Sequence, residues 1–226
     1  MNNLARVYHE KGDFASALKL YEQALNILQT NGAGESWAAA KVEENLGLLH
    51  LDLRHFDVAE KHATDALELR RKLGGNDTPE VAASLVDVGL IRMARSDLPG
   101  AESSFREALT IRQKFLSATH PAVVSAQVRL GEVLLQEGKP QEAEQLLRAA
   151  VASAQSSPFP VLPWQMAEAR NALGACEFAL GNNQQGLTLV RDSVAGLRSH
   201  PQFTVRQQAL QRSEKILSAR NDKRSI

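Results

Sequence analysis

The hydrophobic and small positions of this chain recur at a nearly constant interval of about forty residues. A pair made of an apolar residue and a small residue appears five times, at spacings of 42, 42, 42 and 43 residues: Leu4-Ala5, Leu46-Gly47, Val88-Gly89, Leu130-Gly131 and Leu173-Gly174. Further small residues follow each pair at fixed distances, at Ala17, Ala59, Ala101, Ala143 and Gly186 and again at Ala24, Ala66, Ala108, Ala150 and Ser193. A period of this length predicts stacked supersecondary units, none of which buries its apolar face alone.

Within each repeat, the apolar residues follow the helical period in two segments with a break between them. Proline stands at an expected first helical position after Thr78 and after His120, and Ser36 is a predicted N-cap. Glycines that end the first helix are expected at Gly12, Gly138 and Gly181. We predict helices near residues 2–10, 14–30, 36–51, 56–73, 79–95, 98–115, 121–137, 140–155, 163–180, 183–198 and 201–219.

The repeated small residues predict a close crossing of the two helices in each pair. A glycine inside a helix costs about 1 kcal/mol relative to alanine, so four at one repeat position indicate a packing requirement. Each glycine is expected to admit a large side chain from the facing helix. The candidates for these facing residues are Leu67, Leu109 and Val151.

Composition and charge narrow the classes of function. The chain of 226 residues carries 26 basic and 26 acidic side chains, so no net field favours nucleic acid or an anionic membrane. Aromatic residues make up only 5%, which is low for a core built from strands. A single cysteine, Cys176, excludes an internal disulfide framework and is typical of a reducing compartment. No apolar run is long enough to span a bilayer and the N-terminus is not a signal peptide, so we expect a cytoplasmic protein.

The pattern of Leu4-Ala5, Tyr8, Gly12, Ala17 and Ala24 resembles the tetratricopeptide repeat. The 42-residue period, the opening Asn2-Asn3-Leu4-Ala5 and the linker His120-Pro121-Ala122-Val123 are similar to the kinesin light chain subclass. The resemblance implies an all-α fold, a right-handed superhelical solenoid of about five antiparallel helix pairs and a C-terminal capping helix. It also implies a concave groove that binds a peptide.

The repeat spacing and the resemblance together predict a single solenoid over residues 1–219. Its repeats lie near 1–34, 35–76, 77–118, 119–160 and 161–200, followed by a polar capping helix over 201–219 and a frayed tail over 220–226. The first repeat has fewer residues before its register leucine than the others, so we expect either that a half-turn or more of its first helix is missing or that the chain is a fragment. We expect an open N-terminal face, which is a candidate surface for self-association.

The inner face of such a fold is formed by the first helices, with positions three to four residues apart pointing inward. The residues selected for a peptide-binding groove are Asn3, Arg6, Lys41, Asn45, Leu48, Asp87 and Arg129. Asn3 and Asn45 stand one residue before the register position, where proteins of this subclass use asparagine to hold a peptide backbone. An amide both donates and accepts a hydrogen bond, as the backbone of an extended peptide requires.

The sequence gives no comparable support for catalysis. No nucleophile, base and pocket come together, so no enzyme, cofactor or catalytic residue is predicted. His50, His55 and His62 make a surface metal site conceivable, but no carboxylate or cysteine completes a familiar ligand spacing, and no metal is assigned. The favoured function is a scaffold or adaptor that binds a peptide segment of a partner protein. The alternative is the regulatory or sensing region of a larger protein, such as a kinase or a transcriptional regulator.

Overall fold

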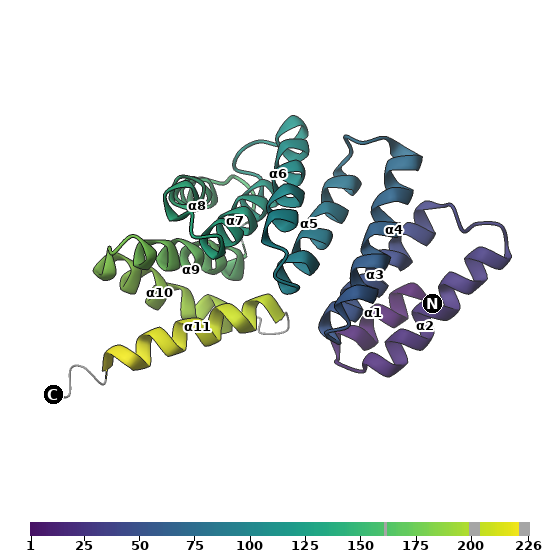
Figure 1. The fold of residues 1–226 in the computed structure, drawn as a ribbon, viewed down its shortest axis with the longest axis horizontal. Coiled ribbons are helices and arrows are strands. Elements are labelled where there is room, and N and C mark those ends of the chain that lie inside the picture. The colour runs from purple at the N-terminus through teal and green to yellow at the C-terminus, as the bar shows by residue number, and fades with distance from the viewer. Residues whose placement is uncertain (161, 199–203, 222–226) are drawn as a thin grey trace. The chain divides into compact units, whose positions relative to one another are not determined.

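The computed structural model describes residues 1–160, 162–198 and 204–221, and over these ranges the chain is helical, with no strand (Figure 1). The helices are α1 (Asn2–Glu10), α2 (Phe14–Thr30), α3 (Trp37–Asp52), α4 (Phe56–Gly74), α5 (Pro79–Ala94), α6 (Leu98–Phe115), α7 (Pro121–Gln136), α8 (Pro140–Gln155), α9 (Pro163–Ala179), α10 (Asn183–Arg198) and α11 (Thr204–Asn221). Every predicted helix is present among the described residues, and its ends lie within two residues of the prediction wherever they can be compared. The start predicted at 201 and the tail from 222 lie outside the described residues.

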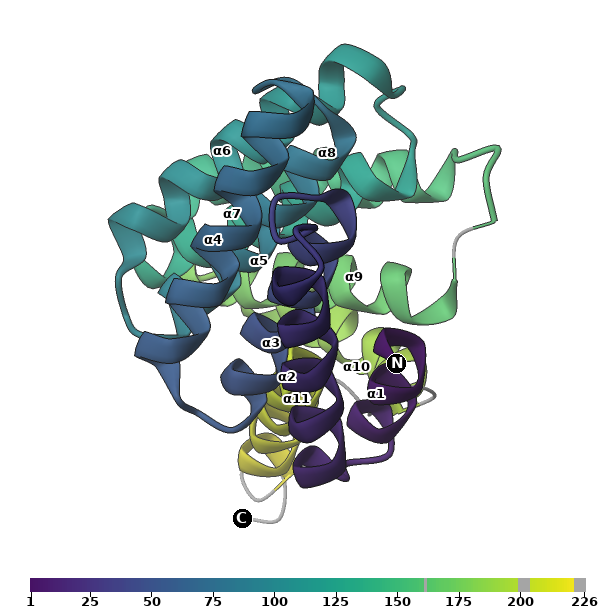
Figure 2. The same cartoon turned by 90° about the vertical axis from the view of Figure 1, so that its right-hand side faces the viewer.

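The chain divides into two compact units, Met1–Arg112 and Gln113–Ile226. In unit 1, α1 packs on α2 and α3 packs on α4, and α3 also contacts α1, α2 and α5. Figures 1 and 2 both show α3 running beside α4. In unit 2, α7 packs on α8 and α9 packs on α10, and α11 lies against α9 and α10. Each unit is therefore a stack of helix pairs, as the repeat predicts.

Local signals explain where the helices begin. Asp13, Ser36 and Thr78 each accept a hydrogen bond from the backbone N–H three residues ahead, at 3.1, 3.1 and 3.2 Å, and so cap α2, α3 and α5. Proline occupies the first turn of α5, α7, α8 and α9, where it removes no helical hydrogen bond. The predicted cap at Ser36 is confirmed.

The turn between the two helices of a pair uses the left-handed backbone conformation at one fixed repeat position. Gly12, Gly138 and Gly181 have φ of 79°, 75° and 85°, as expected for residues that end a helix. At the same position in the second and third repeats stand Arg54 and Ser96, with φ of 61° and 67°. These are the only non-glycine residues with positive φ among those described, so two turns keep the geometry without the residue that suits it best.

The close crossing of paired helices is confirmed, but the predicted facing residues are wrong. A Cβ added at Gly47 would lie 3.1 Å from the backbone nitrogen of Ala63, and one at Gly89 would lie 2.6 Å from Cε1 of Phe105. A Cβ added at Gly131 would lie 2.6 Å from Cγ of Leu147. The predicted partners Leu67, Leu109 and Val151 each lie four residues further along the second helix. The prediction was therefore displaced by one helical turn.

The ends of the two units differ in how they are covered. Leu4 is 52% exposed, whereas Leu46 at the same repeat position is 1% exposed because α1 and α2 pack against α3. Leu4 and Val7 thus leave an exposed apolar surface on α1 among the described residues of unit 1, and self-association through it stays a prediction. In unit 2, Ala209 of α11 packs against Ala167 and Leu197, which gives α11 the covering role expected of the C-terminal helix.

Candidate functional site

The first helices of successive pairs are neighbours within each unit. In unit 1, α3 contacts both α1 and α5, and in unit 2, α7 contacts α9. Side chains that point away from the paired second helices therefore form continuous surfaces, one on α1, α3 and α5 and another on α7 and α9. Six of the predicted groove residues lie in unit 1 and Arg129 lies in unit 2.

The predicted asparagine pair lies on α1 and α3, but the hydrogen bond uses a different asparagine of α1. Asn45 is buried, and its Nδ2 donates to Oδ1 of Asn2 at 2.8 Å. Asn3 is exposed and takes no part in this bond. Among the described residues, Oδ1 of Asn45 and Nδ2 of Asn2 make no further hydrogen bond, which leaves one acceptor and one donor at the junction of α1 and α3.

A mostly buried group of charged side chains from α3, α4 and α5 lies next to Asn45. Glu44 pairs with Lys41 on its own helix and with Arg70 of α4. Arg70 also donates to Oγ of Ser84 at 2.6 Å and to the carbonyl oxygen of Glu80 at 3.1 Å, so it joins α4 to α5. Because Glu44 and Arg70 are both almost fully buried, each needs the other to compensate the loss of hydration.

Asp87 of α5 is the groove residue with the most perturbed chemistry. Burial raises the pKa of Asp87 to about 7, and the nearby carboxylate of Glu44 adds to the rise. The positive charges of Arg70, Lys41 and Arg112 oppose it without cancelling it. The side chain is partly buried, and at neutral pH it changes between the neutral and the charged form.

The two arginines of this group were missed in the sequence, although a signal for them exists. Arg70 and Arg112 are 42 residues apart and so occupy the same position of the second helix in successive repeats. Arg70 forms an ion pair with Glu44, and the positive charge of Arg112 interacts electrostatically with Asp87. The repeat position thus supplies a cation from the second helix to a carboxylate on a first helix.

The two other predicted groove residues of unit 1, Arg6 and Leu48, make no bond to the charged group around Glu44 among the described residues. Arg6 is exposed and pairs with Glu10 one turn ahead, at 2.6 Å. Leu48 is partly buried on α3. Both lie on the first helices of unit 1.

In unit 2, Arg129 is already committed to two carboxylates. It is buried and donates to Glu132 at 2.7 Å and to Glu168 of α9 at 2.6 Å. Burial opposes its charge, but the two carboxylates outweigh this effect and raise the pKa of Arg129 above its usual value. Arg129 therefore ties α7 to α9, and it could reach a ligand only by exchanging one of these partners.

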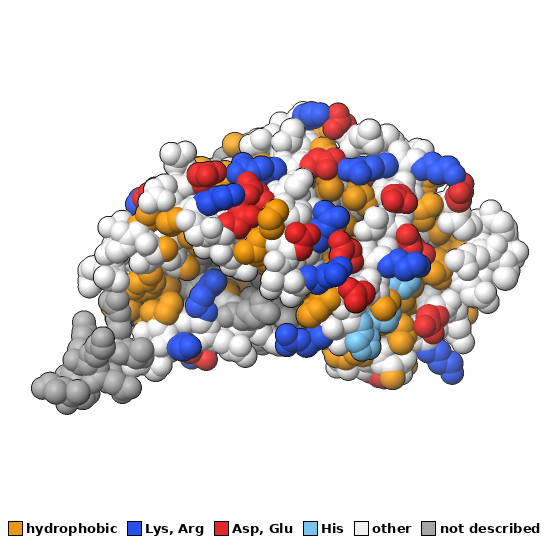
Figure 3. Space-filling view, viewed as in Figure 1, with side chains coloured by type: hydrophobic (Ala, Val, Ile, Leu, Met, Phe, Trp, Pro, Cys, Tyr) orange, Lys and Arg blue, Asp and Glu red, His pale blue; other side chains and the backbone are white. Residues whose placement is uncertain are grey.

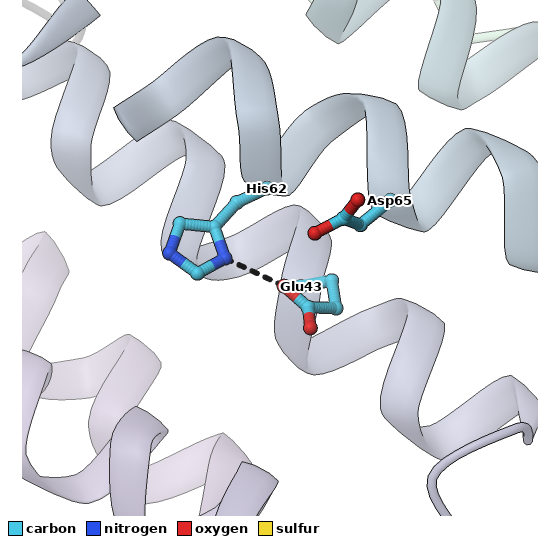
Figure 4. Close-up of side chains that lie close together, drawn as sticks. All are labelled: Glu43, His62 and Asp65. Atoms are coloured by element: carbon cyan, nitrogen blue, oxygen red, sulfur yellow. Dashed lines mark hydrogen bonds and ion pairs between the residues drawn. The ribbon is translucent and has the colours of Figure 1, made fainter. Parts of the chain in front are cut away.

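One group of side chains in the described ranges has the composition of a metal site. Three side chains, Glu43, His62 and Asp65, each offer one ligand atom, a carboxylate oxygen or an imidazole nitrogen (Figure 4). These three atoms all lie within 4.8 Å of one another. Sequence spacing did not find this group because Glu43 comes from α3, whereas the other two residues come from α4. His50 stacks parallel to the His62 ring, with centroids 5.6 Å apart.

Two further features bear on the class of protein. No described helix combines the length and apolar character needed to cross a bilayer. On the face drawn in Figure 3, basic and acidic side chains are interspersed rather than gathered by sign. The architecture is that of an all-α helical-repeat protein, with polar and charged residues along its first helices.

Comparison with known families identifies the repeat. Models of the tetratricopeptide repeat match residues 1–31, 45–114 and 80–156, which together make up more than half of the chain. The chain therefore belongs to the tetratricopeptide repeat family. This family forms protein–protein interaction scaffolds, and no catalytic family is indicated. No curated protein matches the sequence significantly.

Solved structures confirm the fold. The nearly identical TPR-like repeats of a candidate kinesin light chain from Podosopora anserina are 21% identical, with a TM-score of 0.72 over 86% of this chain and 92% of that one. BtubC (BKLC) from P. vanneervenii is 20% identical, with a TM-score of 0.70 over 96% and 78%. A Rap protein complexed with competence and sporulation factor is 20% identical, with a TM-score of 0.64 over 96% and 63%. The predicted all-α, kinesin light chain-like repeat fold is confirmed.

Proposed function

We propose that unit 1 binds an extended segment of a partner protein along the first helices α1, α3 and α5. The observation that carries this proposal is the amide pair of Asn2 and Asn45, which joins two neighbouring first helices at 2.8 Å. Each amide keeps one unused group, and together these groups offer an acceptor and a donor to the backbone of a passing chain. An extended peptide needs both, because its N–H and C=O groups alternate along its length.

The charged group beside this pair favours an acidic residue in the ligand. Three cations, Lys41, Arg70 and Arg112, lie near two carboxylates, those of Glu44 and Asp87. Lys41 is half exposed and is the cation of this group best placed to meet a carboxylate of the ligand. Its present partner Glu44 is shared with Arg70, so Glu44 stays compensated if Lys41 turns to a ligand.

The likeness to a Rap protein complexed with competence and sporulation factor supports binding by this type of fold. At 20% identity it supports the architecture and not the identity of the ligand. The partner is therefore described by its chemistry alone. It is an extended protein segment whose backbone is held near Asn2 and Asn45, with a carboxylate near Lys41.

Selection from a library of displayed linear peptides tests this proposal. Purified wild-type protein should enrich a common sequence that contains Asp or Glu, and Asn2→Ala/Asn45→Ala should weaken its binding about tenfold or more, as expected for two lost backbone hydrogen bonds. The matched control is Gln23→Ala/Asn26→Ala, which removes two exposed amides from α2. Thermal unfolding of each variant separates loss of binding from loss of fold.

Equal binding by the wild type and the Asn2→Ala/Asn45→Ala variant would refute backbone capture at this junction. Enriched peptides without acidic residues would refute the role given to Lys41. Failure of the library to enrich any sequence would count against a linear ligand altogether.

A further inference from the structure

The helix pair α3–α4 carries a group of side chains that lies apart from the amide pair and the charged network. Glu43 stands immediately before Glu44, and successive residues of a helix point about 100° apart. Glu44 meets Arg70, whereas Glu43 points to His62 and Asp65 on α4 (Figure 4). His62 and Asp65 are three residues apart, so they share one face of α4.

Glu43 is a buried carboxylate with an incomplete set of partners. Its side chain is only 10% exposed, and its Oε2 lies 2.6 Å from Nδ1 of His62. Its other oxygen, Oε1, makes no hydrogen bond or ion pair with any residue that the structure describes. Oε1 is not among the side-chain atoms that are buried without a partner, so it keeps contact with solvent and is open to an additional cation.

The surroundings of the group attract cations. A surface hollow beside it is lined by the carboxylates of Glu35, Glu43, Asp65 and Glu68, and by a single ammonium group, Lys72, which pairs with Glu35. Lys61 pairs with Asp65 at 3.3 Å, but the Lys61 side chain is exposed and that of Asp65 is partly exposed, so this ion pair is weak and easily exchanged. A divalent cation can thus reach the group from this hollow, where it has to displace only the exchangeable Lys61–Asp65 pair and the proton shared by His62 and Glu43.

We propose that Glu43, His62 and Asp65 bind a divalent transition-metal ion of the Zn²⁺ type. Their ligand atoms lie within 4.8 Å of one another, and a metal with bonds of about 2.0–2.2 Å holds its ligand atoms roughly 3–4 Å apart. Side-chain shifts of about 1 Å close the set. The imidazole of His62 favours Zn²⁺ and other divalent transition-metal ions over Mg²⁺ and Ca²⁺, which prefer oxygen ligands alone. The ion takes the place of the proton between His62 and Glu43, and links α3 to α4.

Calorimetric titration of the full chain with ZnCl₂ tests this site. Wild-type protein should bind Zn²⁺ and unfold at a higher temperature in its presence, because the metal binds only the folded site. Glu43→Gln and Asp65→Asn should each weaken Zn²⁺ binding about tenfold or more. Each variant replaces one of the two carboxylate ligands by an amide of nearly the same volume. Added Co²⁺ should show visible absorption in the wild type and lose it in Glu43→Gln.

The control addresses a competing pair of histidines. Nδ1 of His50 and Nδ1 of His55 lie 3.4 Å apart, close enough to hold a metal by themselves. His55→Gln leaves the proposed ligands intact and should keep the wild-type affinity. Loss of binding in His55→Gln together with its retention in Glu43→Gln would assign the metal to the histidine pair and overturn the proposal. Absence of Zn²⁺ binding in the wild type would also overturn it.

Discussion

The raised pKa of Asp87 predicts that this carboxylate destabilises the folded protein above neutral pH. In the unfolded chain, an aspartate loses its proton near pH 3.8, whereas burial holds the pKa of Asp87 in the folded state at about 7. Between these values the folded state binds the extra proton, so the free energy of unfolding falls as the pH rises from about 4 to about 7. Above pH 7 both states are charged and this contribution is constant.

The magnitude follows from the shift. One pKa unit corresponds to about 1.4 kcal/mol, so a shift of about three units gives an upper limit of about 4 kcal/mol. Asp87 is partly exposed and three cations lie near it, so we expect about 1–2 kcal/mol between pH 5 and pH 8. Asp87→Asn removes the ionisation and keeps the shape. It should therefore gain that amount of stability relative to wild type as the pH is raised.

Urea unfolding at pH 5 and pH 8 measures the effect as a difference between variant and wild type, which cancels the titration of all other groups. Asp192→Asn, at an exposed position of α10, is the matched control and should show no such pH dependence. An equal stability difference for Asp87→Asn at both pH values would refute the destabilising role of the charged Asp87. It would also be refuted if the variant were less stable than wild type at pH 8, because that would mean the cations hold Asp87 in its charged form.

Three further predictions concern the packing of the repeats. Ser96→Gly should raise the free energy of unfolding by about 1 kcal/mol, because Ser96 adopts a φ of 67° that glycine adopts without strain; an unchanged urea midpoint would show that the turn carries no such strain. Gly131→Ala should lower the thermal midpoint, because its Cβ would lie 2.6 Å from Cγ of Leu147, and overpacking of about 1–3 kcal/mol exceeds the gain in helix propensity of about 1 kcal/mol; adding Leu147→Ala should remove the penalty for the new Cβ, so equal effects of Gly131→Ala in both backgrounds would contradict this. The Cys176 thiol should react slowly with a thiol reagent at pH 8 and rapidly in urea, because burial raises its pKa to about 11; fast labelling of the native protein would show that α9 opens readily.

The sequence by itself determined the repeat and its helices. The 42-residue spacing, the caps and the helix-ending glycines located the described helix ends within two residues, except the start of the last helix, which was predicted at 201 and lies outside the described residues. These signals are local and depend on neighbours along the chain. The glycines at Gly47, Gly89 and Gly131 also showed that paired helices approach closely. The sequence could not show which turn of the second helix lies opposite each glycine, so Val151 was predicted to face Gly131 where the structure places Leu147.

Only the tertiary structure decided which charged residues meet. Glu44 and Arg70, like Glu43 and His62, come from different helices, and their contact depends on the rotation and depth at which α3 packs on α4. A helical wheel gives each residue a direction within its own helix but no distance to a residue on another. The pKa of Asp87 has the same origin, because burial and the charges of three other helices set it rather than the residues next to it in the chain.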